Sequence, residues 1–321
     1  MLQQALNRHS QIVIPPETKF FFSFFGHPKK QQARHVERIN SDLDIDLPVP
    51  SHRICSVEDG REFYEEMATR YMNRQPKSDI AYFGEKTPEH TGLLPDIRRL
   101  FPEAKIIVLQ RDGRDVASSL TRVPWMSPNL YVNFLVWLYY NRIIEREKRR
   151  ALPNVYFARY EDIVADPEGE LGAVLEFLDA TYESSVAKGS GNREGVPQRE
   201  FAWKGRALQP ITTRRTAAFT RELAAEQIGT LEAMGGDALE SLGYPLYAEG
   251  RKPLSPVFYA SVAIDLAKLA LRLPWYSAYK DLFCRFVSGP AAIDSAPVEP
   301  KRSGFFLRAS TPGLVREGSG V

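Results

Sequence analysis

The stretch from Lys105 to Leu120, K-I-I-V-L-Q-R-D-G-R-D-V-A-S-S-L, constrains the fold most strongly. Ile106 to Leu109 is an unbroken apolar run, typical of a strand buried on both faces of a parallel sheet. A charged corner follows it, and Val116 to Leu120 has the pattern of a helix start. This order predicts an α/β fold whose ligands bind beyond the carboxyl ends of the strands.

An arginine ends this strand, and a serine lies eight positions later on the predicted helix. Because the free N–H groups of a helix start favour anions, Arg111 and Ser119 could hold one phosphate from two sides. Alternatively, Arg111 pairs with Asp115 and only caps the helix. Both interpretations stay open at the level of the local sequence.

The same order of strand, charged corner and helix also occurs just before Lys105. Ile80 to Phe83 is a second candidate for a buried strand, Lys86 follows it, and a helix is predicted from Glu89 to Leu100. Two such units in succession predict a parallel sheet with Lys86 and Arg111 at the same edge of neighbouring strands. Two converging cations favour an anion site there.

Two further segments flank these units. Val155 to Phe157 predicts another strand, with Tyr160 at its exit. Ile12 to Ile14 is a short extended run that ends at two prolines, and Glu17 follows them beside a phenylalanine-rich segment. A carboxylate against an apolar wall has its pKa raised by desolvation, which suits a general base. The alternative is that Glu17 is a solvated turn residue.

Composition excludes several classes of protein. The 42 Lys and Arg residues balance 40 Asp and Glu, so the net charge of +2 argues against a bulk nucleic-acid binder. The two cysteines are far apart and form no cluster, so we expect no zinc site or disulfide framework. No apolar leader opens the chain and no apolar run is long enough to span a bilayer, so we expect a cytoplasmic protein without a transmembrane segment.

Three separated blocks stand out in the sequence. They are I-P-P-E-T-K-F-F (Ile14 to Phe21), E-K-T-P-E-H (Glu85 to His90) with the run from Leu100 to Ser119, and R-Y-E-D-I-V-A-D-P-E (Arg159 to Glu168). A looser fourth block is W-K-G-R-A-L-Q-P-I, which begins at Trp203. In content and order these blocks resemble the sulfotransferases that use 3'-phosphoadenosine 5'-phosphosulfate (PAPS). The resemblance implies a three-layer α/β fold of the P-loop NTPase type, with a central parallel sheet flanked by helices.

The resemblance also implies roles for particular residues. Arg111 and Ser119 would bind the 3'-phosphate of PAPS, with Tyr160 and Lys204 beside the same nucleotide. The resemblance makes Glu17 the base that takes the proton from the acceptor. It places Lys86 against the sulfuryl group, where an ammonium offsets developing charge, so no metal is required. His90 is a weaker candidate for the base, and with Glu17 present we expect it on the helix surface or in contact with the acceptor.

The resemblance departs from the family pattern at the start of the chain. Relatives have a first strand and a P-R-S-G-T-T loop that binds the 5'-phosphosulfate, and this loop precedes the helix that Leu2 to Arg8 resembles. The printed sequence contains neither, so we expect in-frame codons upstream of Met1 to encode them. Otherwise we expect a catalytically inactive homologue that binds a nucleotide or a protein. A nucleotide kinase is more remote, because G-x-x-x-x-G-K-[ST] is absent from the sequence.

The chain is predicted to comprise two parts. Residues 1–250 would form the sulfotransferase-like domain, and residues 251–321 an amphipathic helix with a disordered tail. The helix, over residues 255–273, would dock on the domain or a partner; a second interpretation is peripheral contact with a membrane. The expected acceptor is a hydroxyl or amine of a small molecule, carbohydrate, lipid or peptide.

Overall fold

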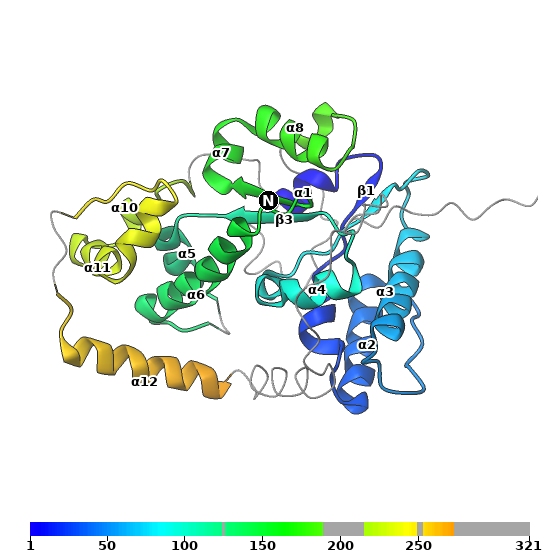
Figure 1. Ribbon diagram of the computed structural model, residues 1–321, viewed down its shortest axis with the longest axis horizontal. Helices are drawn as coiled ribbons and strands as arrows, with labels where there is room; N and C mark the ends of the chain where they lie inside the picture. The colour runs from blue at the N-terminus through cyan, green and yellow to red at the C-terminus, as the bar shows by residue number, and fades with distance from the viewer. Residues whose placement is uncertain (124–125, 189–214, 249–252, 273–321) are drawn as a thin grey trace, which may run out of the picture.

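A computed structural model describes residues 1–123, 126–188, 215–248 and 253–272 (Figure 1). Helices outnumber strands in this part of the chain. The strands are β1 (Ile12–Val13), β2 (Tyr82–Phe83), β3 (Ile106–Gln110) and β4 (Val155–Arg159). The α-helices are α1 (Leu2–Leu6), α2 (Lys29–Leu43), α3 (Val57–Met72), α4 (Leu94–Leu100), α5 (Gly113–Leu120), α6 (Leu130–Arg149), α7 (Tyr160–Ala165), α8 (Pro167–Phe177), α10 (Phe219–Glu222), α11 (Ala225–Ser241) and α12 (Pro256–Arg272). Three short helices complete the described elements: the π-helix η1 (Phe20–Phe24) and the 3-10 helices η2 (Pro88–Leu93) and η3 (Ser184–Val186).

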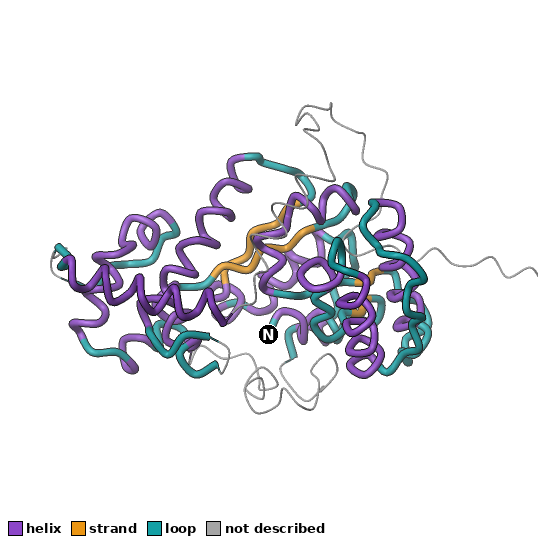
Figure 2. Tube along the Cα trace, turned by 90° about the horizontal axis from the view of Figure 1, so that it is seen from below, coloured by secondary structure: helices purple, strands orange, loops and turns teal. Residues whose placement is uncertain are grey.

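The described strands form two parallel pairs, which Figure 2 shows as separate segments. β1 pairs with β2, and β3 pairs with β4 over the full five residues, from Ile106 opposite Val155 to Gln110 opposite Arg159. The expectation that the strands before Lys86 and Arg111 are neighbours is therefore wrong. Neighbours along a chain are often neighbours in a sheet, but here each of these two strands has a different partner. The α/β class is observed, and a single central sheet stays a prediction.

Helices cover both faces of the β3–β4 pair. On one face, Ala158 packs with Leu171, Val174 and other apolar residues of α8. On the other face, Ile106 and Val108 join the core formed by η1, α3 and α4. Alternate side chains of a strand point to opposite faces, so this short apolar run serves both cores and gives a local three-layer arrangement. In Figure 1, α7 and α8 lie above β3, and α4, α5 and α6 lie below it.

The phenylalanine-rich segment is buried, as predicted. Phe20, Phe21 and Phe24 have no exposed surface, and the ring of Phe24 stacks on Phe63 of α3 with centroids 4.5 Å apart. The segment forms the π-helix η1, which follows Lys19 in a left-handed conformation with φ of 55°. This packing fixes the chain immediately after Glu17.

The segment predicted as one helix from residue 89 to 100 divides into η2 and α4. The helix α2 has 15 residues, with His35, Val36 and Ile39 among those that it buries. The helices α10 and α11 are separate, because Ala224 is extended and its N–H donates to Gln227 Oε1 at 2.9 Å.

The last described helix, α12, packs along α6. Val262 and Leu269 are buried against Val132, and Asn129 donates a hydrogen bond to Asp265 at 2.8 Å. Within the described ranges, no helix combines the length and apolar character needed to cross a bilayer. Peripheral membrane contact by this helix stays a prediction.

Candidate active site

The parallel pairing of β1 and β2 brings two predicted residues together. Val13 lies opposite Phe83, and the Gly84 N–H donates to the Val13 carbonyl at 2.8 Å, so the loops that leave both strands run side by side. The Lys86 ammonium contacts Oε1 of Glu17, although the two residues are 69 positions apart in the chain. The Glu17 side chain is only 11% exposed. The alternative that Glu17 is a solvated turn residue is therefore wrong.

A second carboxylate lies beneath this pair. Glu85 has a fully buried side chain and accepts hydrogen bonds from the hydroxyls of Thr18 and Thr87, both at 2.7 Å. Burial raises the pKa of Glu85 to about 7, and the charge of Glu17 adds to the effect, while the two threonine bonds oppose it. Glu85 thus titrates near neutral pH inside the loops that carry the proposed catalytic pair.

His90 lies below the surface. Its side chain is 8% exposed, its ring packs edge-on against Phe21 with centroids 5.1 Å apart, and Nδ1 is 3.9 Å from Glu85 Oε1. The expectation of a helix-surface position is wrong, because η2 turns this residue toward the phenylalanine core. The geometry links His90 to Glu85.

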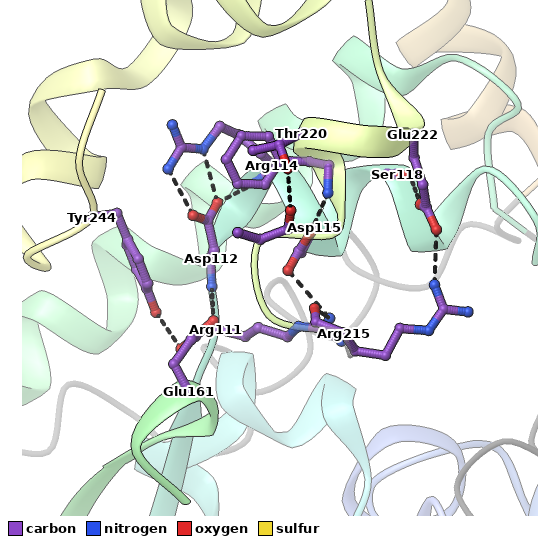
Figure 3. A network of polar contacts seen from close by, with 12 residues as sticks. Arg111, Asp112, Arg114, Asp115, Ser118, Glu161, Arg215, Thr220, Glu222 and Tyr244 are labelled. Atoms are coloured by element: carbon purple, nitrogen blue, oxygen red, sulfur yellow. Dashed lines mark hydrogen bonds and ion pairs between the residues drawn. The ribbon is translucent and has the colours of Figure 1, made fainter. Parts of the chain in front are cut away.

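The pairing of β3 with β4 brings a second set of residues together. Gln110 lies opposite Arg159, so Arg111 and Tyr160 leave the two strands side by side. The guanidinium carbon of Arg111 is 4.3 Å from the centre of the Tyr160 ring, and burial raises the pKa of this tyrosine. Nη2 of Arg111 is 3.4 Å from Asp115 and donates to the Arg215 carbonyl at 2.8 Å (Figure 3). The Arg111–Asp115 pair is therefore present.

One donor of this arginine stays unused. Within the described residues, the buried Nε of Arg111 has no hydrogen-bond partner. The helix is capped by a different side chain, because Asp112 accepts from the Arg114 N–H at 2.9 Å. Arg111 thus has one buried donor that its contacts with Asp115 and Arg215 leave unused, and its side chain as a whole is 25% exposed.

The corner between β3 and α5 is supported by buried charges. Arg114 has no exposed surface, pairs with Asp112 at 2.7 Å and contacts Glu232 of α11. Glu161 accepts from the Asp112 N–H and from the Tyr244 hydroxyl, both at 3.0 Å (Figure 3). These contacts join three segments that are distant in the sequence and fix the start of α5.

The two remaining predicted site residues are Ser119 and Lys204. Ser119 is exposed on α5, whereas the hydroxyl of the neighbouring Ser118 donates to Glu222 at 2.8 Å. The described structure shows no side-chain hydrogen bond for Ser119. Lys204 lies outside the described residues.

Each proposed cation is held by its own carboxylate. Lys86 pairs with Glu17, and Arg111 pairs with Asp115. Within the described residues, β2 pairs with β1 and β3 pairs with β4, so each group lies at the exits of its own strand pair. An anion site shared by Lys86 and Arg111 stays a prediction.

Two contributing residues were missed at the level of the sequence. Glu85 stands in the quoted E-K-T-P-E-H block, where its neighbour Lys86 drew attention; Thr18 is 67 positions away, so no local pattern indicated that two threonines bind this carboxylate. Arg215 contributes its carbonyl to Arg111 and its guanidinium to Glu222 at 2.8 Å. No local pattern around Arg215 indicates these contacts.

Residues 1–184 match the family model described as the sulfotransferase family, and this range is more than half of the chain. The chain belongs to the sulfotransferase family. The resemblance identified from the motifs is thereby confirmed. Five of the predicted site residues of this sulfotransferase lie in the matched range, and Lys204 lies beyond it.

Curated relatives carry a more specific name. The sulfotransferase is 33% identical over 100 residues to "Protein-tyrosine sulfotransferase 2" of Gallus gallus, a match that covers 28% of this chain and 26% of the relative. It is 25% identical over 148 residues to a "Putative protein-tyrosine sulfotransferase" of Caenorhabditis elegans, covering 43% and 52% of the two chains. The matches thus span between about a quarter and a half of these relatives.

Solved structures share the fold. The sulfotransferase domain from the curacin biosynthetic pathway superposes with a TM-score of 0.59 at 17% identity, covering 77% of this chain and 93% of that domain. The sulfotransferase domain from the Synechococcus PCC 7002 olefin synthase gives 0.55 at 21% identity, covering 77% and 90%. At these identities the likeness concerns the fold alone.

Proposed function

We propose that this sulfotransferase moves a sulfuryl group from PAPS to a hydroxyl or amine acceptor. The observation that carries the proposal is the contact between Glu17 and Lys86, two residues that the motifs assign to opposite sides of one transfer reaction. A carboxylate and an ammonium in contact, at the exits of two paired strands, offer a proton acceptor and a cation at the same place.

In the proposed reaction, the acceptor oxygen or nitrogen forms a bond to sulfur as the bond from sulfur to the phosphate oxygen of PAPS breaks. Glu17 accepts the acceptor proton, and Lys86 offsets the charge on the sulfuryl oxygens and the leaving phosphate. The released product is 3'-phosphoadenosine 5'-phosphate (PAP). This logic is close to that of phosphoryl transfer, where positioning and electrostatic stabilisation supply most of the catalysis.

The chemistry around Arg111 fits the 3'-phosphate of the donor. Its side chain is 25% exposed, Tyr160 supports its flat face, and the exposed residue Ser119 lies on the helix that follows. We propose that these three residues bind the 3'-phosphate and that Lys204 closes over the nucleotide. A guanidinium suits this role because it can donate two parallel hydrogen bonds to a phosphate.

The names of the curated relatives suggest where an acceptor search should begin. They are described as protein-tyrosine sulfotransferases, so a tyrosine hydroxyl in a peptide is the first acceptor to test. Carbohydrate, lipid and small-molecule hydroxyls and amines complete the panel.

The test is transfer from sulfur-35-labelled PAPS by the purified full chain, with each acceptor class supplied in turn. We expect labelled product and release of an equal amount of PAP. Binding of PAP without transfer to any acceptor would favour the inactive homologue. ATP turnover that requires magnesium, without sulfuryl transfer, would favour the nucleotide kinase.

A further inference from the structure

Two hydrogen-bond relays converge on the buried carboxylate of Glu85. In the first, the Phe20 N–H donates to the Thr18 hydroxyl at 3.1 Å, and this hydroxyl donates to Oε2 of Glu85 at 2.7 Å. In the second, the Lys19 N–H donates to the Thr87 hydroxyl at 3.3 Å, and this hydroxyl donates to Oε1 at 2.7 Å. A hydroxyl can accept and donate at the same time, so each threonine oxygen accepts from a backbone N–H while its own proton is donated to the carboxylate.

The relays end on the two loops that carry the proposed catalytic pair. Thr18 directly follows Glu17, and Lys86 stands between Glu85 and Thr87. The two loops cannot shift far relative to each other without breaking the Thr18–Glu85 or the Lys19–Thr87 hydrogen bond. The second relay also holds Lys19, whose φ of 55° is a left-handed conformation that a residue with a side chain rarely adopts.

We propose that Glu85 is a positioning residue that sets the separation and orientation of the Glu17 carboxylate and the Lys86 ammonium. This inference rests on the proposed function, because it assigns those two side chains to the transfer reaction. The Glu85 side chain has no exposed surface, so we assign it no contact with donor or acceptor.

The surroundings of Glu85 make the positioning sensitive to pH. The titratable groups that face it are Glu17 and Lys86 from the loops, His90 from η2 and Tyr64 from α3. An ionised carboxylate accepts both threonine protons, whereas a protonated one presents a donor to one of them. Because burial raises the pKa of Glu85 to about 7, the two relays are complete above this pH and one is disturbed below it.

The test compares steady-state kinetics of the wild type with those of Glu85→Gln. An amide cannot accept both threonine protons equally, so we expect kcat to fall about 10- to 100-fold, the loss expected for a small misplacement of reacting groups. We expect the PAP dissociation constant to stay within twofold of the wild type. The limb of the wild-type kcat profile near pH 7 should be absent from the variant.

Two sets of controls separate positioning from folding. Thr87→Ser keeps the hydroxyl and should keep the wild-type kcat, whereas Thr87→Val should resemble Glu85→Gln. Glu147→Gln alters another buried carboxylate, one that pairs with Arg98 outside the proposed site, and should leave both kcat and its pH profile unchanged.

A Glu85→Gln enzyme with wild-type kcat and pH profile would overturn the positioning role while leaving the proposed function intact. A fall in kcat that Glu147→Gln reproduces would also overturn it, since loss of stability would then explain the effect. A wild type that neither binds PAP nor transfers sulfate would instead refute the proposed function, and with it the positioning role.

Discussion

The guanidinium of Arg111 lies 4.3 Å from the centre of the Tyr160 ring, stacked between the ends of two paired strands. The stack and the Asp115 carboxylate fix the plane of the guanidinium, and Nε keeps an unused donor. An arginine held in this way loses little conformational entropy when it binds an anion.

Arg111→Ala should therefore weaken PAP binding by about 10- to 100-fold, since one or two charge-assisted hydrogen bonds are lost. Arg111→Lys should give an intermediate loss, because the charge remains while the stack and the paired donors disappear. Isothermal calorimetry with PAP measures both. Arg34→Ala, which removes an exposed arginine of α2, is the matched control and should bind normally. Wild-type affinity in Arg111→Ala would remove this residue from the donor site.

Glu17→Gln tests the proposed base. The amide nearly matches the carboxylate in size but cannot take the acceptor proton, so we expect kcat to fall by about 10²- to 10⁴-fold. PAP affinity should be retained. Glu37→Gln, an exposed carboxylate on α2, should behave as the wild type in the sulfur-35 assay. Equal turnover in Glu17→Gln would assign the base to another group.

Gly113→Ala should destabilise the protein. A Cβ at this position would lie 2.5 Å from ring atoms of Trp137, whose indole N–H donates to the Arg111 carbonyl at 3.1 Å. The ring cannot move away without breaking that bond, so we expect the free energy of unfolding to fall by about 1–3 kcal/mol. Urea denaturation measures the change. In Gly92→Ala the nearest atom would be 3.7 Å away, and a comparable loss there would contradict the steric explanation.

Glu232→Ala should lower the free energy of unfolding by more than Gly113→Ala does. It leaves the fully buried Arg114 with Asp112 as its remaining carboxylate, and removing one partner of a buried ion pair typically costs about 3–5 kcal/mol. Glu226→Ala on the exposed first turn of the same helix should cost less than about 1 kcal/mol. Thermal and urea unfolding of the two variants give the comparison, and equal losses would show that the buried pair contributes nothing.

Glu85 also predicts how stability depends on pH. Burial raises its pKa from 4.5 to about 7, so the folded protein keeps a proton that the unfolded chain has lost within this interval. The stabilisation that this proton gives to the folded state is complete below pH 4.5 and disappears as the pH rises through 7. The free energy of unfolding of Glu85→Gln, relative to wild type, should rise by roughly 3 kcal/mol across this range.

The free energy of unfolding must be compared between wild type and Glu85→Gln at each pH, because the titration of His35 changes stability with pH in the opposite direction. Burial lowers the pKa of His35 from 6.5 to about 3, so its contribution is present above pH 6.5 and is lost as the pH falls. Since both proteins contain His35, its effect cancels in the difference. A difference that is constant with pH would contradict the shifted pKa of Glu85.

Regular elements with a strong apolar period were predicted well. The apolar run from Ile106 to Leu109 lies within β3, and the helix start predicted at Val116 to Leu120 lies within α5. Such elements are encoded by neighbouring residues, so a short window contains the relevant information. The burial of the phenylalanines was likewise readable, although their π-helical backbone was not.

Strand pairing and the partners of the charged residues could not be read in this way. Thr18 and Glu85 are 67 positions apart, and Arg111 and the Arg215 carbonyl are 104 apart. These contacts depend on which strands adjoin, and the sequence order suggested a wrong neighbour for the strand before Lys86. The donor-binding role of Arg111 was suggested by its position at a strand end, while the pairing of Glu17 with Lys86 required the fold.

The contact between Arg114 and Glu232 restricts how this chain can be recombined with its relatives. The two residues stand on either side of the end of the family match at residue 184, and Glu232 also accepts from the N–H groups of Tyr247 and Ala248. A hybrid that exchanged the segment after residue 184 alone would bury a guanidinium against a foreign surface. A junction placed beyond residue 248 would keep Arg114, Glu232 and the N–H groups that donate to Glu232 in the same parent sequence.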